Sequence, residues 1–346
     1  MIPSLNNKTL FATWGRFPSL RHGSQPRSRT PFLVSIRHFF SGAAVAALVA
    51  ALACAGAYAD ESSKPVKAVK AVATTTLLAG FVEEVGGRLV DVRALVPPGV
   101  DVHSFQTTPQ DSIVMSQARL VVSNGAGLDD FLGSVIRGAA GPDAVHVVAS
   151  DELPAASALD RSRLQGSGHT LEQHVTGPPD PHYWQNPLYV IHYVERIRDG
   201  LIQADGANAD AYRVNAERFV QELRLLDQEI SAILEAVPPK RRHLVTYHDA
   251  FGHFGARYGW KVSGLVSSDA ADVTPATIIT IMGQVQDQGL PAVFAEPQFR
   301  SQVMEQAAQD MGVQVGTIYS DALDRNVATY VEMMRFNAKS LVEHLR

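Results

Sequence analysis

Three histidines and one aspartate stand where an open α/β sheet builds ligand sites. His103 follows an apolar, strand-like run across a Pro-Pro-Gly turn, and His248 directly follows a second such run. Asp321 follows a third run, and His182 ends a long loop just before a helical segment. Ligands of open α/β sheets bind at loops beyond the carboxyl ends of the strands. Since each half of the chain supplies two of these side chains, all four can converge between two lobes.

Imidazole nitrogen together with carboxylate oxygen is a ligand set suited to a borderline cation such as Zn²⁺ in four-coordinate geometry. Three histidines and one aspartate would set one negative charge against the two positive charges of the ion. Four protein ligands would also leave little room for an activated water molecule. Such a site favours carriage of the metal over catalysis.

Each residue also has an ordinary structural interpretation. His103 or His182 alone is compatible with a solvated polar residue on a loop. His248, together with Asp249, is in a position to satisfy the backbone donors of a helix's first turn. An aspartate such as Asp321 is commonplace in a turn after a strand. Spacing alone does not decide between these interpretations and a metal site.

The elements that would position these residues follow from apolar periodicity and from Gly and Pro breaks. The first half of the chain predicts strands at 67–74, 90–96, 120–123 and 145–149, with helices at 78–85, 109–118 and 128–136. The second half predicts strands at 243–247, 261–266, 292–295 and 314–318, with helices at 250–258, 275–288, 302–311 and 329–345. Alternation of strand and helix indicates parallel α/β sheets.

A long helical stretch separates the two halves. The pattern is helical almost throughout 188–237, and Pro238-Pro239 ends it. An uninterrupted helix over 210–236 would span roughly 40 Å. The predicted fold is therefore two parallel-sheet α/β lobes joined by a single long rigid helix, with the metal site in the cleft between the lobes. The predicted boundaries are a leader at 1–59, an N-terminal lobe at 60–205, a bridging helix at 206–239 and a C-terminal lobe at 240–346.

The first 59 residues have the features of a secretory signal peptide. A short, Ala-rich apolar run from Ala43 to Ala53 leads to Ala57-Tyr58-Ala59 before Asp60, an A-x-A cleavage pattern. Two alternatives remain. The run could be a transmembrane anchor, although it is short and broken by glycine. Cys54 could carry a lipid, although the residues around it do not favour this. We expect a periplasmic protein.

Charge and cysteine content restrict the function further. Residues 1–59 hold six of the 30 basic residues and none of the 35 acidic ones, so cleavage leaves 24 against 35, a net charge of −11. A chain this acidic is a poor nucleic-acid binder and a plausible cation handler. The only cysteine is Cys54, so the mature chain has neither a disulfide nor a thiolate metal site. We expect it to be a monomer.

Five stretches, in order along the chain, resemble the motifs of the zinc- and manganese-binding receptors of bacterial metal ABC transporters. They are Pro97–Phe105 with Thr108–Asp111, Asp180–Pro187, Tyr247–Phe254 with Arg257–Gly259, Phe294–Gln298, and Tyr319–Leu323. The resemblance covers essentially all of the mature chain. It implies two α/β lobes bridged by a rigid helix, a non-enzymatic role with a membrane permease as partner, and His103, His182, His248 and Asp321 as the metal ligands.

The third ligand bears on which metal is bound. In this family manganese receptors tend to have Glu there and zinc receptors His, and nitrogen donors favour zinc over the harder manganese ion. His248 therefore predicts Zn²⁺, with Mn²⁺ as the alternative. The sequence departs from the family at Val102 (usually Pro), Gln106 (often Glu) and Gln185-Asn186 (usually Leu-Asp). These departures bear on affinity more than on the identity of the metal.

The loop at 150–181 resembles the His-rich loops of zinc-uptake receptors, because it contains His169 and His174. Either these histidines are incidental and solvated, or the loop gathers zinc or receives it from a periplasmic metallochaperone. The remaining histidines of the mature chain are interpreted as structural or surface residues: His146, His192, His243, His253 and His344. Glu296 is interpreted as structural.

Two other functional classes remain as alternatives. A zinc hydrolase would need an open coordination position and a general base, and the chain lacks His-Glu-x-x-His. A metal-dependent adhesin is suggested only by kinship, since related receptors are sometimes described in that way.

Overall fold

The computed structural model describes residues 68–154, 180–266, 275–299 and 302–346. These residues belong to one compact unit, Pro65–Arg346. The predicted leader, Cys54, and the loop histidines His169 and His174 lie outside the described residues. Within the described part of the chain, no helix combines the length and the apolar character needed to cross a membrane.

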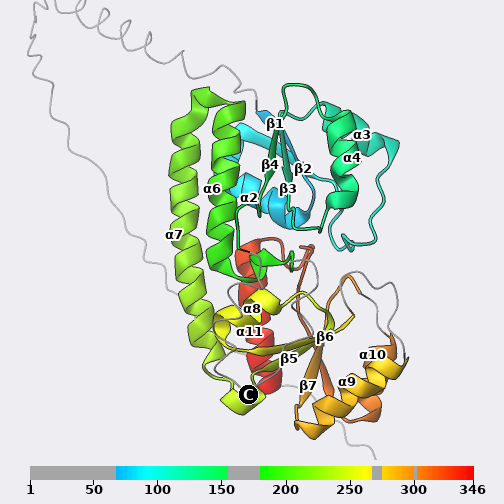
Figure 1. The fold of residues 1–346 in the computed structure, drawn as a ribbon. Helices are drawn as coiled ribbons and strands as arrows, with labels where there is room; N and C mark the ends of the chain where they lie inside the picture. Colours follow the sequence, from blue (N-terminus) through cyan, green and yellow to red (C-terminus); the bar gives the residue numbers. More distant parts are fainter. Residues whose placement is uncertain (1–67, 155–179, 267–274, 300–301) are drawn as a thin grey trace, which may run out of the picture. The chain divides into compact units, whose positions relative to one another are not determined.

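The N-terminal lobe is built on a four-stranded parallel sheet (Figure 1). Its strands are β1 (Val69–Ala73), β2 (Val90–Ala94), β3 (Leu120–Ser123) and β4 (Val145–Val148), in the order β2-β1-β3-β4. The helices that connect them are α2 (Thr76–Gly86), α3 (Pro109–Ser116) and α4 (Gly133–Ala139). β3 is buried throughout and β1 is buried at every residue except Lys70, which explains why both strands are predominantly apolar.

The C-terminal lobe repeats this architecture. Its parallel strands are β5 (His243–His248), β6 (Lys261–Val266), β7 (Ala292–Ala295) and β8 (Gln314–Thr317), in the order β6-β5-β7-β8. Its connecting helices are α8 (Gly252–Tyr258), α9 (Pro275–Asp287) and α10 (Gln302–Asp310). The prediction of two parallel-sheet α/β lobes joined by a long helix is confirmed.

The strand order reverses at the same point in both sheets. The chain passes from β1 to β2 on one side and returns to β3 on the other, and it does the same from β5 to β6 and β7. Such a reversal leaves a crevice at the carboxyl ends of the strands, where ligands bind. Both lobes therefore have loops suited to carrying ligand residues.

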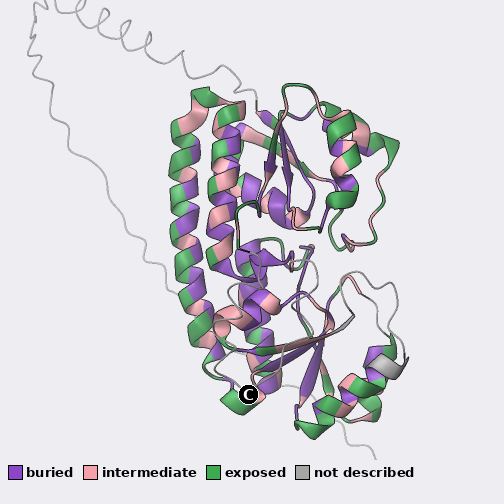
Figure 2. Cartoon of the chain, in the orientation of Figure 1, coloured by how far each residue is buried: buried purple, intermediate pink, exposed green. Residues whose placement is uncertain are grey.

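Three helices outside the strand–helix repeats support the two lobes. They are α6 (Pro187–Ala204), α7 (Ala209–Leu234) and α11 (Tyr330–Leu345), and 3-10 turns precede α6 at Tyr183–Gln185 and α7 at Gly206–Asn208. α7 contacts α2, α6 and α11. It buries one stripe and exposes the other, as the purple and green faces of Figure 2 show. It begins one residue before and ends two residues before the predicted bounds.

α7 is tied to both lobes by polar side chains. Asn215 Nδ2 donates to the carbonyl of Val85 in α2, 3.0 Å away. Near the other end of α7, Asp227 accepts hydrogen bonds from the guanidinium of Arg257 and from the hydroxyl of Tyr258, both in α8. α7 thus contacts the frame of each lobe directly.

One predicted helix, 128–136, is wrong at its start. Residues 130–132 form a 3-10 turn and α4 begins only at Gly133. The reason is Asp129, whose carboxylate accepts hydrogen bonds from the backbone amides of Asn124 and Gly125 and from the hydroxyl of Thr74. These bonds fold the preceding residues into a tight turn with positive φ at Gly125, Ala126 and Gly127.

Candidate metal centre

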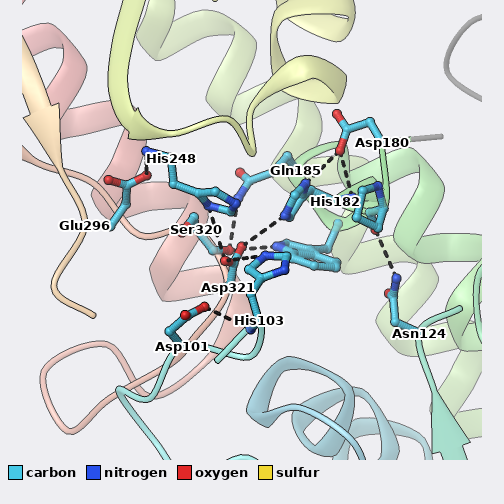
Figure 3. Close-up of polar contacts among 12 residues, drawn as sticks. Asp101, His103, Asn124, Asp180, His182, Gln185, His248, Glu296, Ser320 and Asp321 are labelled. Atoms are coloured by element: carbon cyan, nitrogen blue, oxygen red, sulfur yellow. Dashed lines mark hydrogen bonds and ion pairs between the residues drawn. The ribbon is translucent and has the colours of Figure 1, made fainter. Parts of the chain in front are cut away.

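The side chains of His103, His182, His248 and Asp321 lie together. One ligand atom from each residue can be chosen so that all four atoms are within 4.8 Å of one another. Figure 3 shows the three imidazole rings gathered around the Asp321 carboxylate. His103 and His182 come from the N-terminal half of the chain, and the other two come from the C-terminal half.

The atoms that face one another there have no hydrogen-bond partner. They are Nε2 of His103, Nε2 of His182, both ring nitrogens of His248 and both carboxylate oxygens of Asp321, all of them buried. Buried polar atoms without partners are uncommon in folded proteins, because each costs free energy. Such a cluster is expected where one cation can accept a lone pair from each of the four side chains.

The distances suit a small cation. Oδ2 of Asp321 lies 3.8 Å from Nε2 of His103 and 3.4 Å from Nδ1 of His248, and Oδ1 lies 3.7 Å from Nε2 of His182. Four ligand atoms arranged tetrahedrally at zinc–ligand distances of 2.0–2.1 Å are separated by about 3.4 Å. The contact of Asp321 with His248 already has that spacing, and the contacts with His103 and His182 would reach it if they shortened by a few tenths of an ångström.

His103 reaches the centre on the loop between β2 and α3. Its backbone amide donates to Asp101 Oδ1 at 3.0 Å. Val102, between these two residues, is 1% exposed and anchors the loop in the core. The loop ends at Thr108, whose amide and hydroxyl both donate to Asp111 in the first turn of α3, each at 2.8 Å. The His103 side chain remains 17% exposed, the highest value among the four.

His182 is fixed by its neighbour Asp180. Oδ1 of Asp180 accepts from the backbone amide of His182 at 3.0 Å and from its ring Nδ1 at 2.7 Å. The ring is completely buried and lies edge-on to Trp184, with 5.3 Å between ring centroids. The amide of Asn124, beyond β3, donates to the carbonyl of Pro181 at 3.0 Å.

His248 is the last residue of β5, whereas the sequence predicted that the strand would end at residue 247, just before it. Its backbone amide donates to Oε1 of Glu296, just beyond β7, at 3.2 Å. Glu296 is 1% exposed and its other oxygen has no partner. The prediction of a structural role for Glu296 is consistent with this contact, which also places Glu296 directly behind a residue of the cluster.

Asp321 sits on a loop held from several sides. Trp184 Nε1 and Gln185 Nε2 donate to the carbonyl of the preceding residue, Ser320, at 2.7 and 3.1 Å. Asn337 of α11 binds the backbone of Tyr319 on both sides, through its amide and its oxygen. The loop that carries the Asp321 carboxylate is therefore held by residues of both lobes.

The electrostatics differ from ring to ring. Burial, together with the nearby rings of His182 and His103, lowers the pKa of His248 to about 4, although Asp321 opposes the shift. Burial alone would also lower the pKa of His182, but the carboxylates of Asp321 and Asp180 outweigh it and raise that pKa. Burial beside Asp321 raises the pKa of Glu296 well above its usual range.

Sequence reasoning did not identify the carboxylates that support the histidines. Each of the three histidine backbone amides donates to a carboxylate: Asp101, Asp180 or Glu296. A signal for two of them was present, because Asp-x-His occurs at both His103 and His182, and an aspartate side chain readily binds the amide two residues on. No local pattern connects Glu296 to His248, which lies 48 residues away.

Comparison with known proteins agrees with this arrangement. Residues 71–344 match the family described as "Zinc-uptake complex component A periplasmic". Among curated relatives, the "Manganese-binding lipoprotein MntA" of Halalkalibacterium halodurans is 29% identical over 305 residues, covering 86% of this chain and 96% of the relative. The "Iron-binding protein YfeA" of Yersinia pestis is 25% identical over 323 residues, covering 92% and 98%.

A solved structure extends the likeness to three dimensions. The periplasmic zinc-binding protein TroA from Treponema pallidum superposes with a TM-score of 0.70 at 26% identity, covering 80% of this chain and 99% of the other. The two relatives are thus named for manganese and iron, and the solved structure is named for zinc.

Proposed function

Because this chain belongs to the family of the periplasmic zinc-uptake component A, a family of metal-binding receptors of ABC transporters, we propose that it captures Zn²⁺ and delivers it to a membrane permease. The observation that carries the proposal is the buried cluster of unpartnered ligand atoms on His103, His182, His248 and Asp321. A single divalent cation would satisfy the lone pairs of all four residues. We therefore assign these four as the metal ligands.

The donor set supports zinc over manganese. Three imidazole nitrogens and one carboxylate match the borderline character of Zn²⁺ and its four-coordinate preference. Mn²⁺ prefers oxygen ligands and a higher coordination number, which would need more carboxylate or water in the centre. Mn²⁺ is the second candidate, because curated relatives are named for manganese.

Carriage fits the arrangement better than hydrolysis. With four protein ligands, no coordination position is left for an activated water molecule. Glu296 lies behind His248, and its Oε1 accepts a hydrogen bond from the backbone amide of His248, so that oxygen is not free to act as a general base. The relatives are binding proteins of transport systems by name. A hydrolase would be supported only by metal-dependent turnover that His248→Ala abolishes.

We propose the following course for capture. The ion enters beside His103, the most exposed of the four side chains. Asp321 and His182 already face each other across 3.7 Å and form the receiving half of the site. Binding removes the proton from any imidazole that is still charged, since only the neutral ring has a lone pair to donate. The loaded receptor then docks the permease on the outer face of the membrane.

Competition binding tests the assignment of the metal. Purified protein is titrated with Zn²⁺ and with Mn²⁺ against a chelator, and His103→Ala, His248→Ala and His248→Glu are measured beside the wild type. We expect one tightly held zinc per chain and a loss of more than about 100-fold in each alanine variant, beyond the 10–100-fold typical of outer partners. His192→Ala is the matched control, because its ring binds the carbonyl of Asp151 instead.

His248→Glu separates the two metals. Replacing a nitrogen donor by a carboxylate should shift the preference toward Mn²⁺ by reducing zinc affinity. If the wild type prefers Mn²⁺, the receptor function stands and the zinc assignment is wrong. If it binds neither ion tightly, the receptor proposal itself fails.

A further inference from the structure

The three histidines of the cluster differ in how their rings are held. Neither ring nitrogen of His248 has a hydrogen-bond partner, and Nε2 of His103 has none. His182 alone among the three has a ring nitrogen in a hydrogen bond in the described part of the chain, through Nδ1 to Asp180. Its Nε2 points at Asp321 (Figure 3).

We propose that Asp180 is a positioning residue that fixes both the tautomer and the orientation of His182, so that this ring receives the ion as a preformed ligand. The inference deepens the proposed receptor function and rests on it. Asp180 does not face the cluster. Its effect on the metal passes entirely through the ring of His182.

The hydrogen bonds determine the tautomer. Oδ1 of Asp180 accepts from the backbone amide of His182 and from its ring, and a carboxylate can only accept. Nδ1 must therefore carry the ring proton, which leaves the lone pair on Nε2, 3.7 Å from Asp321. The two bonds to one oxygen also fix the ring relative to its own backbone. Outer carboxylate partners of this kind orient metal-binding histidines and increase their basicity.

The C-terminal lobe holds Asp180 in place. His253 Nε2 lies 3.0 Å from the backbone carbonyl of Asp180. A Cβ atom at Gly252, the first residue of α8, would lie 2.5 Å from Oδ2 of Asp180, which is closer than real Cβ contacts allow. Any side chain at position 252 would therefore displace the carboxylate from its present place. Helix α8 begins four residues after His248. The helix that follows one ligand, His248, therefore supports Asp180, which holds another ligand, His182.

Gly252 provides a test that leaves Asp180 and all four ligands unchanged. Gly252→Ala should push the Asp180 carboxylate away from its place against the ring. Gly252 has no positive φ, so alanine brings the side-chain clash without backbone strain. Gly80→Ala is the matched control, because a Cβ there meets nothing within 4 Å.

The experiment compares the full chain with Asp180→Asn, Asp180→Ala, Gly252→Ala and Gly80→Ala. The first readout is ¹⁵N NMR of the His182 ring in metal-free protein, which reports the tautomer directly. The second is Zn²⁺ affinity by chelator competition. An asparagine oxygen can accept both hydrogen bonds, so Asp180→Asn should keep the Nδ1–H tautomer and lose at most a few-fold in affinity.

We expect Asp180→Ala to lose the single tautomer and to bind Zn²⁺ about 10–100-fold more weakly. Gly252→Ala should follow it in the same direction, and Gly80→Ala should match the wild type. If Asp180→Ala does not fold, Gly252→Ala carries the test. The inference is wrong if Asp180→Ala keeps both the tautomer and the affinity of the wild type. Where Asp180→Ala does not fold, the same result in Gly252→Ala overturns it. Absence of zinc binding in the wild type would instead refute the receptor function, while the tautomer of the metal-free ring still decides the role of Asp180.

Discussion

At the scale of single residues, the same side-chain type occupies three different environments. The His182 ring is held by a hydrogen bond to Asp180, and His103 is partly open to solvent. His248 is buried, and neither of its ring nitrogens has a hydrogen-bond partner. The carboxylates around them raise the pKa of His182, whereas burial lowers the pKa of His248 to about 4. His182 and His248 therefore titrate in different pH ranges.

Zinc affinity should fall as the pH falls, and His182 should account for more of the change than His248. Because its pKa is raised, His182 keeps its second proton to a higher pH than a free histidine, and zinc must displace that proton. His248, with a pKa of about 4, is already neutral over this range and offers no proton to displace. The measurement is chelator competition between about pH 5 and 8.

Zinc affinity falls with falling pH by mass action, because protons and zinc compete for the same lone pair. Asp180→Asn removes one of the charges that raise the His182 pKa, so the steepest part of its curve should move to lower pH. A zinc affinity independent of pH over this interval would contradict the assignment of histidine ligands.

At the scale of elements, the long helix α7 depends on a buried carboxylate. Asp227 is 4% exposed and is paired with Arg257 and Tyr258 of α8. Arg257→Ala would leave that carboxylate buried with one hydroxyl partner. Removing one partner of a fully buried pair costs 3–5 kcal/mol, and since the Arg257 side chain is 31% exposed we expect about 2 kcal/mol.

Urea unfolding of metal-free protein measures this cost. The control is Arg213→Ala on the same helix, whose pair with Asp210 is exposed on both sides and should contribute less than about 0.5 kcal/mol. Equal stability of the two variants would show that the Asp227 contact does not anchor α7.

The elements themselves were largely predictable, because their signals are local. β3 and β7 match their predicted bounds, since short apolar runs between turn residues define them. The helix predicted at 128–136 was wrong at its start because Asp129 binds backbone amides of a turn. The candidate ligands were identified from family motifs, whereas the bond from His248 to Glu296 depends on a β5–β7 pairing that no local pattern records.

At the scale of the whole molecule, contacts between the lobes surround the cluster. Ser320, next to Asp321, accepts hydrogen bonds from Trp184 and Gln185 of the N-terminal half. The amide of Leu323 donates to the hydroxyl of Thr76 at the start of α2, 3.0 Å away. Neither contact uses a ligand atom of the cluster, so the interface does not depend on the ion to hold it together.

We therefore expect only a small movement of the lobes on zinc binding. Spin labels on cysteines introduced at Arg137 in α4 and Gln309 in α10, in a Cys54→Ala background, should change their separation by less than about 2 Å. Pulsed electron paramagnetic resonance with and without Zn²⁺ measures this distance. A shift of several ångströms would indicate hinge closure instead of local ordering around His103.

The central claim is that His103, His182, His248 and Asp321 together hold one zinc ion. X-ray absorption at the zinc edge of the stoichiometrically loaded protein tests it most directly. The predicted result is a four-coordinate ion with three imidazole nitrogens and one carboxylate oxygen at about 2.0–2.1 Å, and loss of one imidazole contribution in His248→Ala. A six-coordinate, oxygen-rich shell, or a spectrum unchanged in His248→Ala, would contradict the account.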